Sequence, residues 1–159
     1  MCSSDLAKTP AGSAGPKDVV VSLPGGAISK AAAFTYLSAP TIASVSPASG
    51  PTAGGTTITV SGTNLLGATV KVADVAATSV VVAPGGTTLT AVTPPGTAGA
   101  KSVSVYTPGG SATKVGAFTY TSGATIASVT PAFGPTAGGT AITITGTNLA
   151  GASAVSVGG

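Results

Sequence analysis

A stretch of fifteen residues occurs twice in this chain, and its spacing limits the folds that the chain can adopt. The first copy spans residues 41–55 and the second spans residues 125–139, so the copies lie 84 residues apart. They differ at two positions, Ser46/Thr130 and Ser49/Phe133. A fixed internal period indicates repeated structural units, and a period this long predicts small domains in tandem rather than a solenoid of short repeats.

A second motif marks the other end of the repeating unit. The tetrapeptide Ala-Phe-Thr-Tyr occurs at residues 33–36 and again at 117–120, also 84 residues apart. These positions predict one complete unit over residues 39–120. Residues 11–37 match the C-terminal part of a unit, and residues 123–159 match the N-terminal part of another, which stops about halfway through its strands.

Residues 1–10 are predicted to be linker or non-native sequence. Met1 to Leu6 has no counterpart in the repeat and resembles the translation of a sequencing adapter, which would make this reading frame part of a larger gene. The alternative is a lipoprotein whose mature chain begins at Cys2, but that needs an apolar segment before the cysteine, and only Met1 precedes it. Because Cys2 is the only cysteine, the units are expected to fold without a disulfide. No signal peptide is visible in the sequence.

Within the complete unit, apolar and polar residues alternate in short runs that are separated by glycine and proline. Ile58 and Val60 fall on one face of a strand, whereas Thr57 and Thr59 fall on the other. The stretch at 47–55 is rich in proline and glycine, which predicts a compact irregular loop. Several short strands at intervals of about 8–12 residues predict an all-β fold, a sandwich of two sheets.

The same alternation predicts which side chains form the core. The apolar residues expected on the inner faces are Ile58, Val60, Leu65, Val70, Val72, Val103, Val105, Phe118 and Tyr120.

The partial units are expected to leave strands without partners. Residues 18–23 and 33–37 predict a hairpin around the turn Pro24-Gly25-Gly26, with the earlier strands of its unit missing. Unpaired, one-sided apolar strands favour fraying, self-association or mutual pairing of the two partial units, in one chain or between chains.

The order of these motifs resembles that of the IPT/TIG family of immunoglobulin-like domains over nearly the whole chain beyond residue 10. The residues that carry the resemblance are Ser46-Pro47, Gly50-Pro51, Gly54-Gly55-Thr56, Gly62-Thr63-Asn64-Leu65, Thr93-Pro94-Pro95, Gly109-Gly110 and Phe118-Thr119-Tyr120. The resemblance implies an early-set immunoglobulin-like β-sandwich of the kind found in arrays on bacterial surface and secreted proteins, and hence an extracellular or cell-surface location. Relatives also occur in extracellular receptors, beside polysaccharide-acting enzymes and in transcription factors.

Charge argues against a nucleic-acid partner. The chain has six lysines, three aspartates and a net charge of +3, and it contains no arginine, glutamate or histidine. The complete unit holds only Lys71, Lys101 and Lys114, which are spread along the sequence. Nucleic-acid interfaces need several cations on one face and commonly use arginine to contact bases. The DNA-contacting function of some relatives is therefore not expected here.

The residue inventory also argues against catalysis and metal binding. Asp74 is the only carboxylate side chain in the complete unit. General acid–base catalysis needs paired titratable groups, and nucleophilic catalysis needs a base beside the nucleophile. Calcium takes about six to eight oxygen ligands. We therefore predict no catalytic residue, no metal site and no cofactor, and we interpret Asp74 as a turn residue.

The function that remains is a non-catalytic structural spacer that supports adhesion or display by other domains. Only residues 121–124 separate the second unit from the third, so adjacent units are expected to touch. The expected partners are the neighbouring repeats of the same chain, with no nucleic acid and no membrane insertion.

The alternative is an accessory module that binds a glycan or a protein. Sugar binding commonly uses exposed aromatic faces, and the chain has three tyrosines and no tryptophan. Tyr106 is the candidate ring of the complete unit, because Phe118 and Tyr120 are expected in the core. Phe133, which replaces Ser49 in the third unit, is expected to pack against the neighbouring domain.

Overall fold

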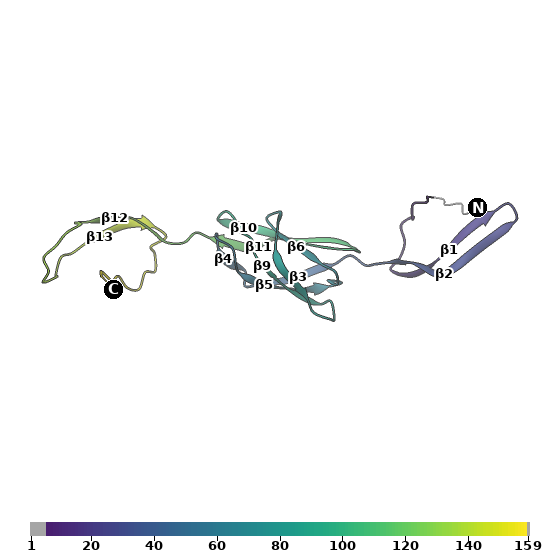
Figure 1. Cartoon of the computed structure of the whole chain (residues 1–159), viewed down its shortest axis with the longest axis horizontal. Coiled ribbons are helices and arrows are strands. Elements are labelled where there is room, and N and C mark those ends of the chain that lie inside the picture. Colours follow the sequence, from purple (N-terminus) through teal and green to yellow (C-terminus); the bar gives the residue numbers. More distant parts are fainter. Residues whose placement is uncertain (1–5, 159) are drawn as a thin grey trace.

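The computed structural model describes residues 6–158, and all regular secondary structure among them is β-strand (Figure 1). The strands fall into three groups along the chain. Strands β1 (Gly15–Leu23) and β2 (Gly26–Tyr36) form a first hairpin, and β12 (Thr125–Thr130) and β13 (Thr143–Thr147) form a last pair. The interpretation of Met1 to Leu6 as adapter sequence lies, apart from Leu6, outside the described residues.

The complete unit lies between these two pairs and contains nine strands. They are β3 (Thr41–Ser46), β4 (Ser49–Pro51), β5 (Thr57–Thr63), β6 (Thr69–Val72), β7 (Val75–Ala76), β8 (Thr78–Val82), β9 (Thr88–Val92), β10 (Gly99–Thr107) and β11 (Gly110–Thr121).

Two sheets make up this unit. One has the strand order β4-β11-β10-β6-β7 and the other has the order β3-β5-β9-β8. Only β4 and β11 run parallel; the other neighbours in both sheets are antiparallel. The predicted all-β, immunoglobulin-like sandwich is confirmed. No part of the chain from residue 6 to residue 158 forms a helix that could span a membrane.

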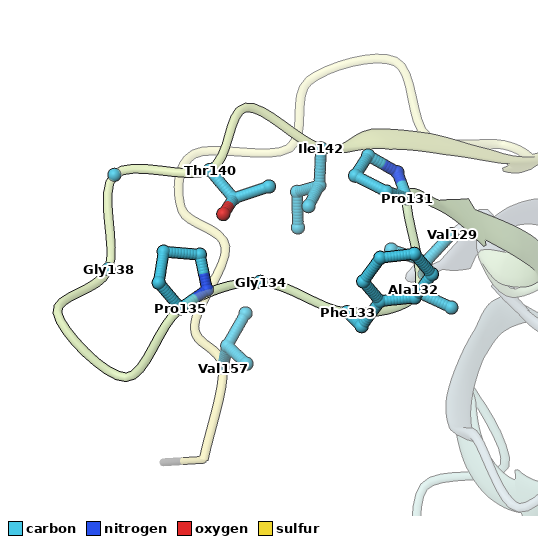
Figure 2. Close-up of a pocket in the computed structure, with 11 residues that line it drawn as sticks. Val129, Pro131, Ala132, Phe133, Gly134, Pro135, Gly138, Thr140, Ile142 and Val157 are labelled. Atoms are coloured by element: carbon cyan, nitrogen blue, oxygen red, sulfur yellow. The ribbon is translucent and has the colours of Figure 1, made fainter.

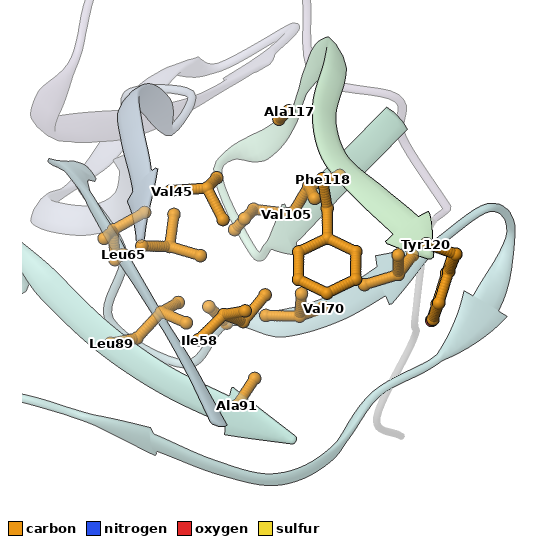
Figure 3. Packing of buried hydrophobic residues seen from close by; sticks show 14 residues of the cluster. Val45, Ile58, Leu65, Val70, Leu89, Ala91, Val105, Ala117, Phe118 and Tyr120 are labelled. Atoms are coloured by element: carbon orange, nitrogen blue, oxygen red, sulfur yellow. The ribbon is translucent and has the colours of Figure 1, made fainter. Parts of the chain in front are cut away.

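The core of the complete unit contains the side chains that the alternation of apolar and polar residues predicted. All nine predicted core side chains are at most 2% exposed. Figure 3 shows side chains of the two sheets, among them Ile58, Leu89 and Phe118, converging between the layers. The Phe118 and Tyr120 rings meet edge to face, with their centroids 5.0 Å apart, an arrangement that the quadrupoles of aromatic rings favour.

Two short strands depart from the prediction. The stretch at 47–55, expected to be wholly irregular, contains β4, which pairs with the far end of β11. The prediction of an irregular loop is wrong at these three residues because a backbone 70 residues away in sequence offers hydrogen-bonding groups that local composition cannot reveal. Strand β7 was also not expected; it folds back on β6 through a turn at Ala73 and Asp74, both at positive φ. The role of Asp74 as a turn residue is confirmed.

Candidate functional site

The junction between the first hairpin and the complete unit is held by the complete unit itself. Four residues, 37–40, connect β2 to β3. The amide of Asn64 donates a hydrogen bond to the carbonyl oxygen of Ala39, with an N···O distance of 3.0 Å. The linker also passes so close to the turn between β10 and β11 that a Cβ added to Gly109 would lie 2.2 Å from the Ser38 carbonyl oxygen. The linker is therefore packed and hydrogen-bonded, not a free tether.

The same clamp recurs at the next junction. Asn148 lies 84 residues after Asn64, and its amide donates to the carbonyl oxygens of Gly123 and Ser122 at 3.1 and 3.3 Å. Both asparagines have positive φ, 56° and 53°, a conformation that asparagine adopts more readily than most residues. Sequence reasoning named Asn64 only as part of the Gly62-Thr63-Asn64-Leu65 motif that carries the family resemblance. The repeated Gly-Thr-Asn-Leu motif was the available signal for this clamp.

Tyr106 lies on the outer face of the five-stranded sheet. It follows the buried Val105 in β10, and its side chain is 39% exposed. In the sheet register its neighbours are Ser111 on β11 and Thr69 on β6, both exposed. The Lys71 ammonium lies 5.5 Å from the centre of the Tyr106 ring, within cation–π range. This face therefore combines one accessible aromatic ring with two hydroxyls and one cation.

Tyr120, by contrast, is buried in the core. Its hydroxyl donates a hydrogen bond to the carbonyl oxygen of Pro94, and Tyr36 makes the equivalent bond to Pro10 in the first hairpin. Burial raises the pKa of the Tyr120 phenol above its ordinary value of 10.0, and a hydrogen bond with Thr93 partly offsets this effect. The phenol is therefore neutral at physiological pH and acts as a structural donor.

Phe133 does not behave as the sequence led us to expect. Its side chain is 87% exposed, so the expectation that it packs against the neighbouring domain is wrong. Figure 2 shows the ring beside Val129 and Pro131, at the rim of a hollow of about 520 Å³ next to β12 and β13. A second hollow, of about 510 Å³, lies against the first hairpin beside Val19 and Phe34. Each hollow lies beside a two-stranded sheet.

The described residues contain no group of three or more histidine, cysteine, aspartate or glutamate side chains that could hold a metal ion. The carboxylates within residues 6–158 belong to Asp18 and Asp74. Asp18 accepts a hydrogen bond from the backbone N–H of Ala32, and Asp74 lies in the turn after β6.

Comparison with one solved structure, that of plexin A4, shows the fold. The chain is similar to the full extracellular region of plexin A4, with a TM-score of 0.53 and 22% identity over 77% of this chain and 11% of that one. It is also similar to SGBP-B from a complex xyloglucan utilization locus in Bacteroides uniformis, with a TM-score of 0.48 and 25% identity over 70% of this chain and 31% of that one. An auxiliary nutrient binding protein from Bacteroides thetaiotaomicron matches with a TM-score of 0.43 and 22% identity over 57% and 23% of the two chains.

This chain thus spans less than a third of the length of each of these solved structures. A comparison with curated proteins finds no match. The family model described as the IPT/TIG domain matches residues 40–121 and 124–159, which together make up more than half of the chain. The chain therefore belongs to the IPT/TIG domain family.

Proposed function

We propose that the complete unit is a non-catalytic spacer of an extracellular or cell-surface protein, and that it holds neighbouring modules apart in a fixed direction. The observation that supports this proposal best is the clamped linker. A tether of glycine and serine would leave adjacent modules free to reorient. Here the linker backbone is instead bonded by Asn64 and packed on the turn at Gly109. Recurrence of the clamp at Asn148 indicates a device of the repeat rather than an accident of one junction.

Substituting Gly109 with alanine is expected to loosen the first junction. Real Cβ atoms essentially never lie within 3.0 Å of another atom, so the Ser38 backbone would have to move. Spin labels attached at Ser29 and Thr78, with Cys2 replaced by serine, should give a narrow distance distribution in the unmodified chain. The distribution should broaden in Gly109→Ala, measured by pulsed electron paramagnetic resonance in dilute solution.

Gly25→Ala provides the matched control. Gly25 occupies the same turn 84 residues earlier, and a Cβ added there would meet nothing within 4 Å. This variant should leave the distribution narrow. A broad distribution in the unmodified chain would contradict the spacer proposal, because it would mean that the two parts reorient freely despite the clamp.

A second candidate function is glycan binding through the face that carries Tyr106. The supporting observation is the 39% exposed ring, flanked in the sheet register by the hydroxyls of Ser111 and Thr69. An aromatic face can stack on a pyranose while hydroxyls and the Lys71 amine bond to its oxygens. On this proposal the module would be an accessory domain that holds a polysaccharide near another domain.

Replacing Tyr106 with alanine tests this second function. Affinity electrophoresis in gels containing hydroxyethyl cellulose, laminarin or soluble xylan should show retardation of the unmodified chain by at least one polymer. Tyr106→Ala should weaken the retardation by about tenfold, because truncation of tyrosine is among the costliest changes at interfaces. Val81→Ala, at an exposed position of β8, is the control and should bind normally. Equal retardation of Tyr106→Ala would remove Tyr106 from any such site.

A further inference from the structure

Six side chains lie on the outer face of three neighbouring strands of the complete unit, and we call this surface the Tyr106 face. Val70 and Val105 are buried on the inner face of these strands, so the residues that alternate with them point outward. The register joins the six residues into two rows across β6, β10 and β11. One row is Thr69, Tyr106 and Ser111, and the other is Lys71, Ser104 and Thr113.

Lys71 is the only charged residue among these six, so the Tyr106 face carries one positive charge. The carboxylates within residues 6–158 lie elsewhere in the fold. Asp18 belongs to the first hairpin and accepts a hydrogen bond from Ala32, and Asp74 lies in the turn at the end of β6. A ligand that brings a negative charge to the Tyr106 face therefore meets an opposite charge. Electrostatic complementarity of this kind favours an anionic ligand over a neutral one.

The cation lies directly against the aromatic ring. Lys71 is opposite Ser104 in the register, which makes it a diagonal neighbour of Tyr106 on the adjacent strand. Its ammonium nitrogen lies 5.5 Å from the centre of the Tyr106 ring and is attracted to the ring face. A ligand that stacks on the ring either displaces this ammonium or lies beside it. In both arrangements the ligand and the ammonium are neighbours.

A neutral sugar and an acidic sugar differ in what they offer to that ammonium. A neutral pyranose that displaces it removes the cation–π attraction and supplies only hydroxyl groups in return. A uronate pyranose supplies a carboxylate, which accepts a charge-assisted hydrogen bond from the ammonium. Specificity is the difference between the two free energies of binding. We propose that the Tyr106 face binds an acidic polysaccharide whose sugars carry a C6 carboxylate, in preference to the uncharged polysaccharide of the same linkage.

This inference rests on the second candidate function, glycan binding at Tyr106, and adds the class of sugar. The carboxylate of a uronate is bonded directly to the pyranose ring, so its charge stays at the edge of a stacked sugar, and Lys71 lies beside the ring on which that sugar stacks. Nucleic acids and densely sulfated polymers instead depend on several cations on one face. The Tyr106 face has a single cation, which fits a polymer whose charges are recognised one sugar at a time.

The extent of the Tyr106 face suits a short stretch of polymer. Adjacent strands lie about 4.8 Å apart, so a row of three residues extends over about 10 Å, the length of roughly two linked pyranose rings. Thr69 and Ser111 flank the ring of Tyr106 on the two neighbouring strands and place hydroxyls beside a stacked sugar. The hydroxyls of Ser104 and Thr113 lie 2.8 Å apart and bond each other, so the second row is held together within the protein.

Isothermal titration calorimetry with the 159-residue chain tests the preference. The ligands are hexagalacturonate and hexamannuronate, each measured beside the same hexamer with its carboxylates methyl-esterified. The ester is the matched control, because it keeps the linkage and the stacking faces of the sugar and lacks the charge. At least one of the two acids should bind about fivefold more tightly than its ester, since a single ion pair at an exposed site contributes modestly to binding.

Substitution of Lys71 tests the assigned source of the preference. Lys71→Met removes the charge and keeps an aliphatic chain beside the ring, so the acid and its ester should bind equally. Lys71→Arg keeps the charge and should retain the preference. Lys114→Met is the control for the loss of one positive charge. Lys114 lies opposite the buried Val103, so its side chain leaves from the other face of the sheet, and this variant should retain the preference.

The outcomes separate this inference from the function on which it rests. Equal affinity for both acids and their esters, with loss of binding in Tyr106→Ala, would overturn the preference for acidic sugars and leave glycan binding in place. Failure of all four hexamers to bind would overturn both. Binding of an acid that survives in Tyr106→Ala, or that falls equally in Lys71→Met and Lys114→Met, would show attraction of a polyanion to lysines in general and would overturn the inference.

Discussion

Replacing Phe118 with alanine is expected to remove most of the stability of the complete unit. Phe118 is fully buried between the sheets and packs edge to face on Tyr120. Truncation of a buried phenylalanine commonly costs about 3–5 kcal/mol. A unit of this size is stable by only about 4–12 kcal/mol. We therefore expect hydrogen exchange of the β5 and β9 amides to accelerate strongly, since both strands belong to the complete unit.

Phe34→Ala is the matched control for this experiment. The residue lies in the same Ala-Phe-Thr-Tyr motif, but its side chain is 40% exposed because β1 and β2 are not covered by a second sheet. This substitution should leave exchange in β5 and β9 unchanged. If both variants accelerated that exchange equally, the stability of the complete unit would depend on the first hairpin, contrary to the packing described above.

Gly54→Ala is expected to produce the second largest loss of stability. Gly54 has a φ of 76°, which costs an alanine about 1–2 kcal/mol. Its Cβ would also lie 2.5 Å from the Pro94 backbone, a rigid neighbour. Such overpacking commonly costs about 1–3 kcal/mol more. The two effects together predict a loss of about 2–5 kcal/mol, measurable as a lower urea midpoint for loss of β5 and β9 protection.

Gly55→Ala separates the two causes. Gly55 has a similar φ of 80°, but a Cβ added there would meet nothing within 4 Å. It should therefore show only the backbone cost of about 1–2 kcal/mol. Equal losses for the two variants would mean that the contact between the loop at Gly54 and Pro94 relaxes without cost.

The positions of strands and the identity of core side chains could be predicted from the sequence, because both depend on the local alternation of apolar and polar residues. Alternation of apolar and polar residues, as at Ile58 and Val60, places every second side chain on one face wherever the chain is extended. The 84-residue offset extended this information from one unit to its neighbours. The family followed from the order of the glycine and proline motifs, because turns between strands need those residues at fixed places.

The contacts of the candidate sites could not be predicted in the same way. That Lys71 lies over the Tyr106 ring depends on the register of β6 against β10, and that Asn64 holds Ala39 depends on the path of the linker. Neither the register of paired strands nor the path of a linker can be predicted from the periodicity of a single strand. Phe133 failed as a prediction for the same reason, because the strands that would surround its loop are not part of the last pair.

By itself, the sequence therefore determined the repeat period, the all-β class and the core-facing side chains of β5, β6, β10 and β11. Only the tertiary structure decided that residues 49–51 form a parallel edge strand and that two asparagines clamp the linkers. The physical reason is the separation in sequence over which each interaction acts. Side-chain alternation acts between neighbouring residues, whereas strand pairing and burial join backbone and side chains that lie tens of residues apart.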